Sequence, residues 1–414
     1  MTAVPGPGYA FYDQEEERSV LAVLQALLNS RDTYGKPQLI SQARSFEEAA
    51  GERLNSPYCL SLNSGTSALL AGLAALGIGP GDEVIVPGFM FIATISTVVH
   101  SGATPVFAEI DTSLTLDPQD VRRKITERTR AIVAVHMLGA SCDMAALSQI
   151  AEENGLYLIE DVAQACGGTY RGAPLGTLGD VGAFSLDTFK VINGGGAGGF
   201  LLMKDGRLFQ RAYSFHDQGW FPGREETGDG DVIFGLNLRM PEFNAAFARA
   251  QLAKLDTVLE RTRLVKSQLD KLIPLRPGLE QRRLNDPDGD CATVSVYLFD
   301  QPEAAQAVAQ ELGCSTLDKS RRHYYAQINA LSPPPDQEAP TCPFQHKPGE
   351  KRRNTLAPGE LPRTDNLLSR AVALSVGLSD SYLGSGFGAS VRSDPDELSG
   401  IADRFSAAAA QALR

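Results

Sequence analysis

The sequence lacks a long hydrophobic run, an excess of positive charge and any paired C-x-x-C motif. No stretch reaches the length of a membrane span, and the N-terminus has no basic region followed by an apolar core. The 38 basic residues against 50 acidic ones give a net charge of −12, which argues against nucleic acid or an anionic membrane as the main partner. The six scattered cysteines indicate neither a zinc site nor a disulfide framework, and we expect no bound metal. We therefore expect a cytoplasmic globular protein.

Apolar segments alternate with helical patterns between residues 58 and 160. The expected strands cover residues 58–62, 83–86, 105–108, 131–135 and 157–159, and the expected helices cover 67–76, 91–101, 118–125 and 144–154. Such a repeat is typical of an α/β fold with a mostly parallel sheet flanked by helices.

Beyond Arg239 the pattern changes, and Pro241 suits the first turn of a long helix. The pattern then predicts a strand at 293–299, a helix near 303–312 and a closing helix from about Pro395, where Asp394 and Glu397 resemble a capping box. We expect a large domain over residues 1–255, with an N-terminal helical segment, and a smaller C-terminal α+β domain over 256–414.

The most informative stretch runs from Leu156 to Met203. Asp161 stands at the C-terminal end of an apolar strand, where open α/β sheets bind ligands. A second expected strand at 181–186 leads to Lys190, which is followed by a run rich in glycine. A lysine amine, a carboxylate and a close backbone approach are what pyridoxal 5′-phosphate (PLP) requires of a protein.

PLP also requires phosphate donors and a flat surface against its ring. The backbone N–H groups of Gly65 and Thr66 would open a helix after an apolar strand, and Ser185 could add a hydroxyl. Phe91 follows the strand at 83–86 and could cover the ring face. An ordinary helix cap and a core aromatic are the alternatives at these positions.

Six segments in this order resemble the DegT/DnrJ-type sugar aminotransferases, a family of fold-type-I PLP enzymes. These segments are NSGTSAL (63–69), GDEVIVPGFMFIAT (81–94), GATPVFAEID (102–111), EDVAQACGGTYRG (160–172), GTLGDVGAFSLDTFK (176–190) and GLNLRMPEFNAAFARAQLAKLD (235–256). The resemblance implies the following roles: Lys190 forms the Schiff base, Asp161 holds the pyridine nitrogen, Gln164 bonds the ring hydroxyl, Phe91 stacks on the ring, Gly65, Thr66 and Ser185 hold the phosphate, and Asn237 reaches the phosphate of a neighbouring subunit.

The resemblance implies a transaminase that moves an amino group from an amino acid, glutamate or glutamine, to a keto sugar. It also implies a homodimer with shared active sites. Within the family, GGTYRGAPLGTLGDVG, SLDTFK and GLNLRMPEFNAA are most similar to enzymes that aminate eight-carbon keto-acid sugars.

One departure concerns the glycines that follow the lysine. Family members usually carry Gly-Glu-Gly-Gly there, whereas residues 194–199 of this chain contain no acidic residue. That leaves open a PLP-dependent elimination or condensation, and a catalytically silent binding protein is a second alternative. The run also matches G-x-G-x-x-G, but a strand pattern follows it at 200–203 instead of the helix that a dinucleotide site needs.

Further polar residues are weaker candidates. We expect His136, at a strand end, to be a hydrogen-bonded core residue. His216, Trp220 and Arg224 in the segment 214–224 are candidate substrate contacts. The loop 332–362 is rich in proline and charge; its basic residues could meet an anionic group of the substrate or simply be solvated, and they are Lys347, Lys351, Arg352 and Arg353.

Overall fold

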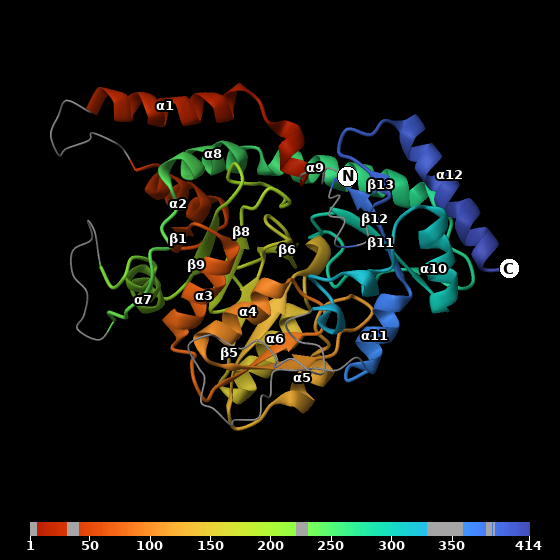
Figure 1. The fold of residues 1–414 in the computed structure, drawn as a ribbon, viewed down its shortest axis with the longest axis horizontal. Coiled ribbons are helices and arrows are strands. Elements are labelled where there is room, and N and C mark those ends of the chain that lie inside the picture. Colours follow the sequence, from red (N-terminus) through yellow and green to blue (C-terminus); the bar gives the residue numbers. More distant parts are fainter. Residues whose placement is uncertain (1–5, 31–40, 221–230, 329–358, 378–382, 384–385) are drawn as a thin grey trace, which may run out of the picture.

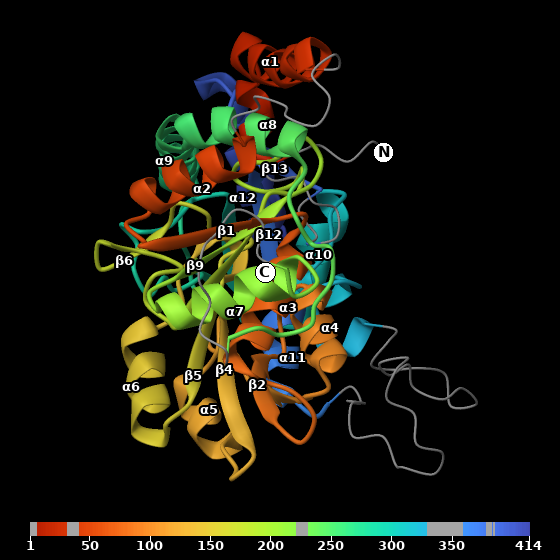
Figure 2. The ribbon, with the colours of Figure 1, turned by 90° about the vertical axis from the view of Figure 1, so that its left-hand side faces the viewer.

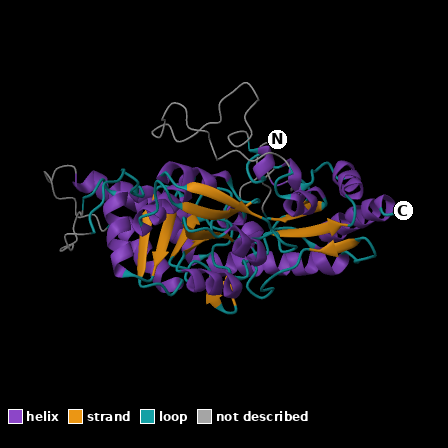
Figure 3. Cartoon of the chain, turned by 90° about the horizontal axis from the view of Figure 1, so that it is seen from below, coloured by secondary structure: helices purple, strands orange, loops and turns teal. Residues whose placement is uncertain are grey.

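The computed structural model describes residues 6–30, 41–220, 231–328, 359–377, 383 and 386–414. Its strands form a seven-stranded sheet, a four-stranded sheet and a small hairpin, and Figure 3 shows the two main groups of strands side by side. In the part of the chain described, no helix is long and apolar enough to cross a membrane.

The seven-stranded sheet has the order β1-β9-β8-β5-β4-β2-β3. Neighbouring strands from β8 to β3 are parallel, whereas β9 is antiparallel to both β1 and β8. The strands are β1 (Tyr58–Leu62), β2 (Glu83–Pro87), β3 (Thr104–Ala108), β4 (Thr129–Val135), β5 (Tyr157–Asp161), β8 (Val181–Ser185) and β9 (Gly199–Met203). The carboxyl ends of the parallel strands therefore meet at one edge, where the amino end of β9 also lies.

Helices cover both faces of this sheet. Successive side chains of a strand point to opposite faces, and the buried strands carry apolar residues on both. Val84 and Val86 join one apolar core, and Ile85 between them joins the other. The first core includes residues of α3 (Gly65–Leu76), α4 (Ile92–Ser101) and α7 (Gly206–His216). The second includes residues of α2 (Gln42–Arg53), α5 (Pro118–Lys124), α6 (Met144–Asn154) and α8 (Glu242–Ala253). Figure 2 shows α6 on one side of the strands and α3 and α4 on the other.

The C-terminal part of the chain packs around the four-stranded sheet, in the order β10-β11-β12-β13. Its strands are β10 (Leu279–Gln281), β11 (Val294–Phe299), β12 (Ala371–Val376) and β13 (Gly388–Ala389). Its helices are α9 (Leu255–Leu272), α10 (Pro302–Glu311), α11 (Pro362–Ser369) and α12 (Pro395–Ala412). At the N-terminus, the short turn η1 (Pro7–Phe11) precedes α1 (Gln14–Ser30), which lies along α8 (Figure 1), and the hairpin joins β6 (Thr169–Tyr170) to β7 (Ala173–Pro174).

The α/β fold class is confirmed, with a mostly parallel sheet, flanking helices and a smaller C-terminal sheet. The single long helix expected after Pro241 is wrong, because α8 ends at Ala253 and α9 begins at Leu255. The ammonium of Lys254 at this junction lies 2.7 Å from the carboxylate of Glu16 and 2.8 Å from the carbonyl oxygen of Phe11. The expected domain division at residue 255 stays a prediction.

Candidate active site

The predicted cofactor residues gather at the edge where the parallel strands end. Asp161 is the last residue of β5 and Ser185 the last of β8, while Gly65 and Phe91 stand at the starts of the helices that follow β1 and β2. They line a cavity of about 190 Å³. Its lining comprises Ser64, Gly65, Thr66, Leu69, Phe91, Ala93, Asp161, Ala163, Ser185, Asp187, Phe189, Lys190, Ala197, Gly198 and Arg322.

The carboxylate of Asp161 is buried and held at both oxygens. The Thr94 hydroxyl donates to Oδ2 at 2.7 Å, and the backbone N–H of Ala163 donates to Oδ1 at 3.1 Å. Only 3% of the residue is exposed. These bonds fix the side-chain orientation while both oxygens keep lone pairs for a further donor.

Lys190 and Phe91 face each other across the cavity. The Nζ atom of Lys190 lies 5.5 Å from the centroid of the Phe91 ring. The backbone N–H of Lys190 donates to the carbonyl of Asp187, and the N–H of Gly6 donates to the carbonyl of Thr188. Hydrogen bonds within the turn that carries the lysine, and from the N-terminal segment to it, thus hold this turn in place.

Gly65 and Ser185 lie against each other at the start of α3. A Cβ atom on Gly65 would be 2.6 Å from the Cβ of Ser185, so only glycine allows this approach. Ser64 caps the helix through the N–H of Ser67 at 3.1 Å, and the N–H groups of Gly65 and Thr66 lie outside this cap. Helix-start N–H groups beside a hydroxyl are well suited to bind an anion.

The glycine run after Lys190 brings its backbone to the same helix start. A Cβ atom on Gly199 would be 2.4 Å from the carbonyl carbon of Ser64, and Ser64 pairs with Gly198 in an isolated bridge. Because Gly199 begins strand β9, the G-x-G-x-x-G run opens a strand, which excludes the dinucleotide-binding arrangement here.

Two predicted residues do not line the cavity. Gln164 is buried, and its Oε1 atom accepts a hydrogen bond from the N–H of Leu138 at 2.9 Å. Asn237 is exposed, and its Oδ1 atom accepts from Nε of Arg239 at 3.0 Å. An exposed position agrees with a residue that serves another subunit, although that role stays a prediction.

The structure adds one wall that the sequence analysis missed. Residues 322–325 pair with residues 88–92: Ile92 donates to the carbonyl of Arg322 at 2.8 Å, and Met90 donates to that of His323 at 2.9 Å. The His323 ring lies 5.3 Å from the Phe91 ring. Burial, together with the positive charges of Lys190 and Arg322, holds the pKa of His323 well below its usual value of 6.5. A neutral imidazole therefore packs against the Phe91 ring.

Glu160, next to Asp161, is structural. It accepts hydrogen bonds from the N–H groups of Gly176, Leu178 and Gly179 at 2.7–2.8 Å. Burial would raise the pKa of this carboxyl, but the hydrogen bonds from His136 and the backbone lower it overall. His136 is fully buried and contacts Glu160 at 3.0 Å, the position expected for a hydrogen-bonded core residue.

The weaker candidates either do not line the cavity or lie outside the described residues. His216 is the last residue of α7 and is buried, so the segment 214–224 begins within a helix. The side chain of Trp220 is exposed. The remaining candidates lie outside the described residues; they are Arg224, Lys347, Lys351, Arg352 and Arg353.

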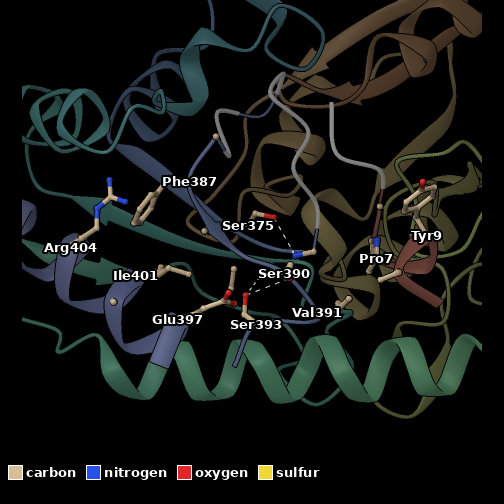
Figure 4. Close-up of a pocket in the computed structure, with 17 residues that line it drawn as sticks. Pro7, Tyr9, Ser375, Phe387, Ser390, Val391, Ser393, Glu397, Ile401 and Arg404 are labelled. Atoms are coloured by element: carbon tan, nitrogen blue, oxygen red, sulfur yellow. Dashed lines mark hydrogen bonds between the residues drawn. The ribbon is translucent and has the colours of Figure 1, made fainter. Parts of the chain in front are cut away.

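A second cavity, of about 630 Å³, lies between the N-terminal turn and the C-terminal sheet (Figure 4). Pro7, Phe387, Val391 and Ile401 make much of its lining, and Arg404 stacks on Phe387 at 4.9 Å. None of the predicted site residues lines it. Chemistry and not volume therefore identifies the smaller cavity as the candidate active site.

Comparison with known proteins identifies the family to which the chain belongs. The model of the DegT/DnrJ/EryC1/StrS aminotransferase family matches residues 14–377. The chain belongs to this family. Its members depend on PLP, so the expected family and cofactor are confirmed.

Several relatives are named for the compounds that they use or make. An L-glutamine:2-deoxy-scyllo-inosose aminotransferase from Streptomyces fradiae is 39% identical over 241 residues, which cover 56% of this chain and 57% of that protein. The enzyme of the same name from Streptomyces lividus is 35% identical over 71% of this chain and 73% of its own length. A GDP-perosamine synthase from Vibrio cholerae is 39% identical over 53% of this chain and 59% of its own. The alignments thus span between about half and three quarters of these relatives.

Solved structures of aminotransferases have the same fold as this chain over its whole length. An aminotransferase from Psychrobacter cryohalolentis superposes with a TM-score of 0.76 at 25% identity, and S. venezuelae DesV, solved with a ketimine intermediate, does so with a TM-score of 0.76 at 28% identity. Both alignments cover 100% of each chain.

The residues present fit PLP. The close packing of Gly65 on Ser185 brings the N–H groups at the start of α3 and the Ser185 hydroxyl to one side of the cavity, a donor set that suits a phosphate. The buried carboxylate of Asp161 fits a protonated ring nitrogen, and Phe91 offers a ring face opposite the Lys190 amine.

Proposed function

We propose that the protein is a PLP-dependent aminotransferase that moves an amino group from an amino acid, glutamine or glutamate, to a keto sugar or a similarly hydroxylated cyclic ketone. The convergence of Lys190, Asp161, Phe91, Gly65 and Ser185 on one cavity carries the proposal. The names of the relatives support the donor and the hydroxylated acceptor. The narrower expectation of an eight-carbon acceptor stays a prediction.

When bound, PLP supplies an aldehyde that takes up the amino group and a ring that accepts electrons from a breaking Cα–H bond. The Lys190 amine would hold the cofactor and, when free, would move the proton to and from the substrate Cα. Asp161 keeps the proton on the ring nitrogen, and its bonds from Thr94 and Ala163 hold it in place. Gly65, Thr66 and Ser185 bind the phosphate.

Arg322 is the residue that we assign to the carboxylate of the donor amino acid. It is one of the residues that line the cavity with Lys190, and its backbone carbonyl accepts the hydrogen bond from Ile92. A guanidinium binds a carboxylate through two parallel hydrogen bonds. Arg322 would thus place the donor Cα near the lysine amine.

We further propose that the active protein is a homodimer. Phe234 and Leu236, which precede Asn237, are 96% and 54% exposed, and α1 exposes Leu21, Leu24 and Leu28 along one face. Apolar groups so exposed are typical of an interface. A partner that covers the segment around Phe234 would bring its own site close to Asn237.

The proposal is tested by borohydride reduction of the PLP-loaded protein, followed by peptide mapping and an amine-transfer assay. We expect the cofactor on the peptide that contains Lys190, and one equivalent of 2-oxo acid from the donor for each aminated acceptor. The Lys190→Ala variant should show neither. Labelling of another lysine would contradict the site, and 2-oxo acid formed without aminated product would contradict the transfer reaction.

A further inference from the structure

Arg282 is a buried cation outside the candidate active site. It follows strand β10 and is 6% exposed. Its Nε atom donates to the carbonyl of Ser113 and a terminal nitrogen donates to the carbonyl of Met137, each at 2.7 Å. Burial lowers the pKa of this guanidinium to about 10, while the carboxylates of Asp290 and Asp111 act in the opposite sense. Arg282 is therefore still charged at neutral pH.

The turn that Arg282 holds is unusual. Leu138, directly after Met137, has φ 59° and ψ 36°, a left-handed conformation that a leucine rarely adopts. The next residue, Gly139, accepts a hydrogen bond from the N–H of Cys291 at 3.0 Å. The turn 137–139 is thus held at both ends by the segment 282–291 of the C-terminal part of the chain, and that support stabilises the rare conformation.

The same conformation controls Gln164. The N–H of Leu138 donates to Oε1 of Gln164 at 2.9 Å. With its carbonyl oxygen bound there, the amide of Gln164 has its two N–H groups left to donate elsewhere. To donate to the ring hydroxyl of the cofactor, the side chain must present its amide nitrogen and not its oxygen, and the hydrogen bond from Leu138 selects that orientation.

We propose that Arg282 is a positioning residue that acts through the 137–139 turn to fix the amide of Gln164 toward the cofactor. The inference rests on the proposed function and on the role that the family resemblance implies for Gln164, a hydrogen bond to the ring hydroxyl. The path runs from the guanidinium to the Met137 carbonyl, through the Leu138 N–H, and then to Oε1 of Gln164. Without Arg282 the turn relaxes, the Leu138 N–H turns away and the amide rotates.

A double-mutant cycle tests this path in the full-length protein. The variants are Arg282→Met, Gln164→Ala and the two together, and the readouts are the PLP dissociation constant, the visible absorption maximum of the bound cofactor and the melting temperature. Arg283→Met is the matched control, because Arg283 is the next residue but its side chain is 54% exposed and pairs with Asp111.

We expect Arg282→Met to weaken PLP binding by about tenfold, the scale of one lost hydrogen bond, and to shift the absorption maximum. In the Gln164→Ala background the same change should alter PLP binding less than about twofold, because the amide it acts on is gone. Arg283→Met should match the wild type. If Arg282→Met does not fold, the cycle is run with Arg282→Lys, which keeps the charge but lacks the guanidinium whose separate nitrogens bond the two carbonyls.

Equal losses of PLP affinity in both backgrounds would overturn the path and leave Arg282 a purely structural residue. So would an unchanged absorption maximum and affinity in a folded Arg282 variant. A wild-type protein that binds no PLP would instead overturn the proposed function, so the two failures are distinguishable.

Discussion

Replacing Asp161 by asparagine should abolish most of the activity while preserving the fold. The structure shows why the fold survives. In the wild type, Oδ1 accepts from the N–H of Ala163 and Oδ2 accepts from the hydroxyl of Thr94. An asparagine can keep both contacts, because its oxygen accepts from Ala163 and its amide donates to the lone pairs of Thr94. Only the negative charge is removed.

The loss of that charge should slow amine transfer by about 100- to 1000-fold, or about 2.7–4 kcal/mol, the scale of one strong electrostatic stabiliser. Thr94→Val should give a smaller loss of about tenfold. It keeps the shape of the side chain but removes one hydrogen bond to a charged group, worth about 1.5–3 kcal/mol, which water can partly replace. The order of effects should therefore be Asp161→Asn well above Thr94→Val.

Thr97→Val is the matched control, one turn further along α4. Its buried hydroxyl donates to the carbonyls of Ala93 and Thr94, each at 3.0 Å, within the helix. Single-turnover rates, PLP affinity and melting temperature should be measured for all three variants. Near-normal turnover in Asp161→Asn, or a loss in Thr97→Val as large as in Thr94→Val, would refute the reasoning.

Three further predictions follow from the geometry. Arg322→Gln should raise the KM for the amino-acid donor by at least about tenfold with PLP affinity unchanged, as measured by donor and acceptor half-reactions, and an effect confined to the acceptor would contradict the assignment. The depressed pKa of His323 means that the unfolded state binds more protons below pH 6.5, so stability should fall as pH falls through that range. In denaturant titrations, His323→Gln should flatten this slope by up to about 1.4 kcal/mol per pH unit, and an identical slope would count against a neutral buried imidazole. Mixed Lys190→Ala and Asn237→Ala subunits should regain part of the activity through hybrid dimers, and the lack of any rescue despite subunit exchange would argue against a shared site.

The elements of the large sheet could be predicted because each carries its own local signal. Buried parallel strands read as short apolar runs, and the helices between them are long enough to show their period. The site could be predicted in the same way. Asp161 and Ser185 end strands, Gly65 and Phe91 stand at the starts of the helices that follow two other strands, and the sheet brings these strand ends to one edge.

The missed features depend on contacts between distant parts of the chain. Nothing near Arg322 in the sequence indicates that residues 322–325 pair with residues 88–92. Thr94 looks like any threonine on a helix until Asp161 is placed beside it. The junction between α8 and α9 also has a distant partner, since Lys254 contacts Glu16, more than 200 residues earlier.

The residues assigned to the cofactor and the residue assigned to the donor come from different parts of the chain. The residues assigned to hold the cofactor, apart from Asn237, come from the large sheet and the elements around it, whereas Arg322, assigned to the donor, comes from the C-terminal part. A shift of the C-terminal part would therefore move the donor contact against Lys190 while leaving Asp161 and Ser185 in place. Gln164 is the exception, because the turn that orients it is held by Arg282 and Cys291. If the 282–291 segment moves together with residues 322–325, donor binding would change the orientation of the Gln164 amide and, through it, the hydrogen bond to the cofactor ring.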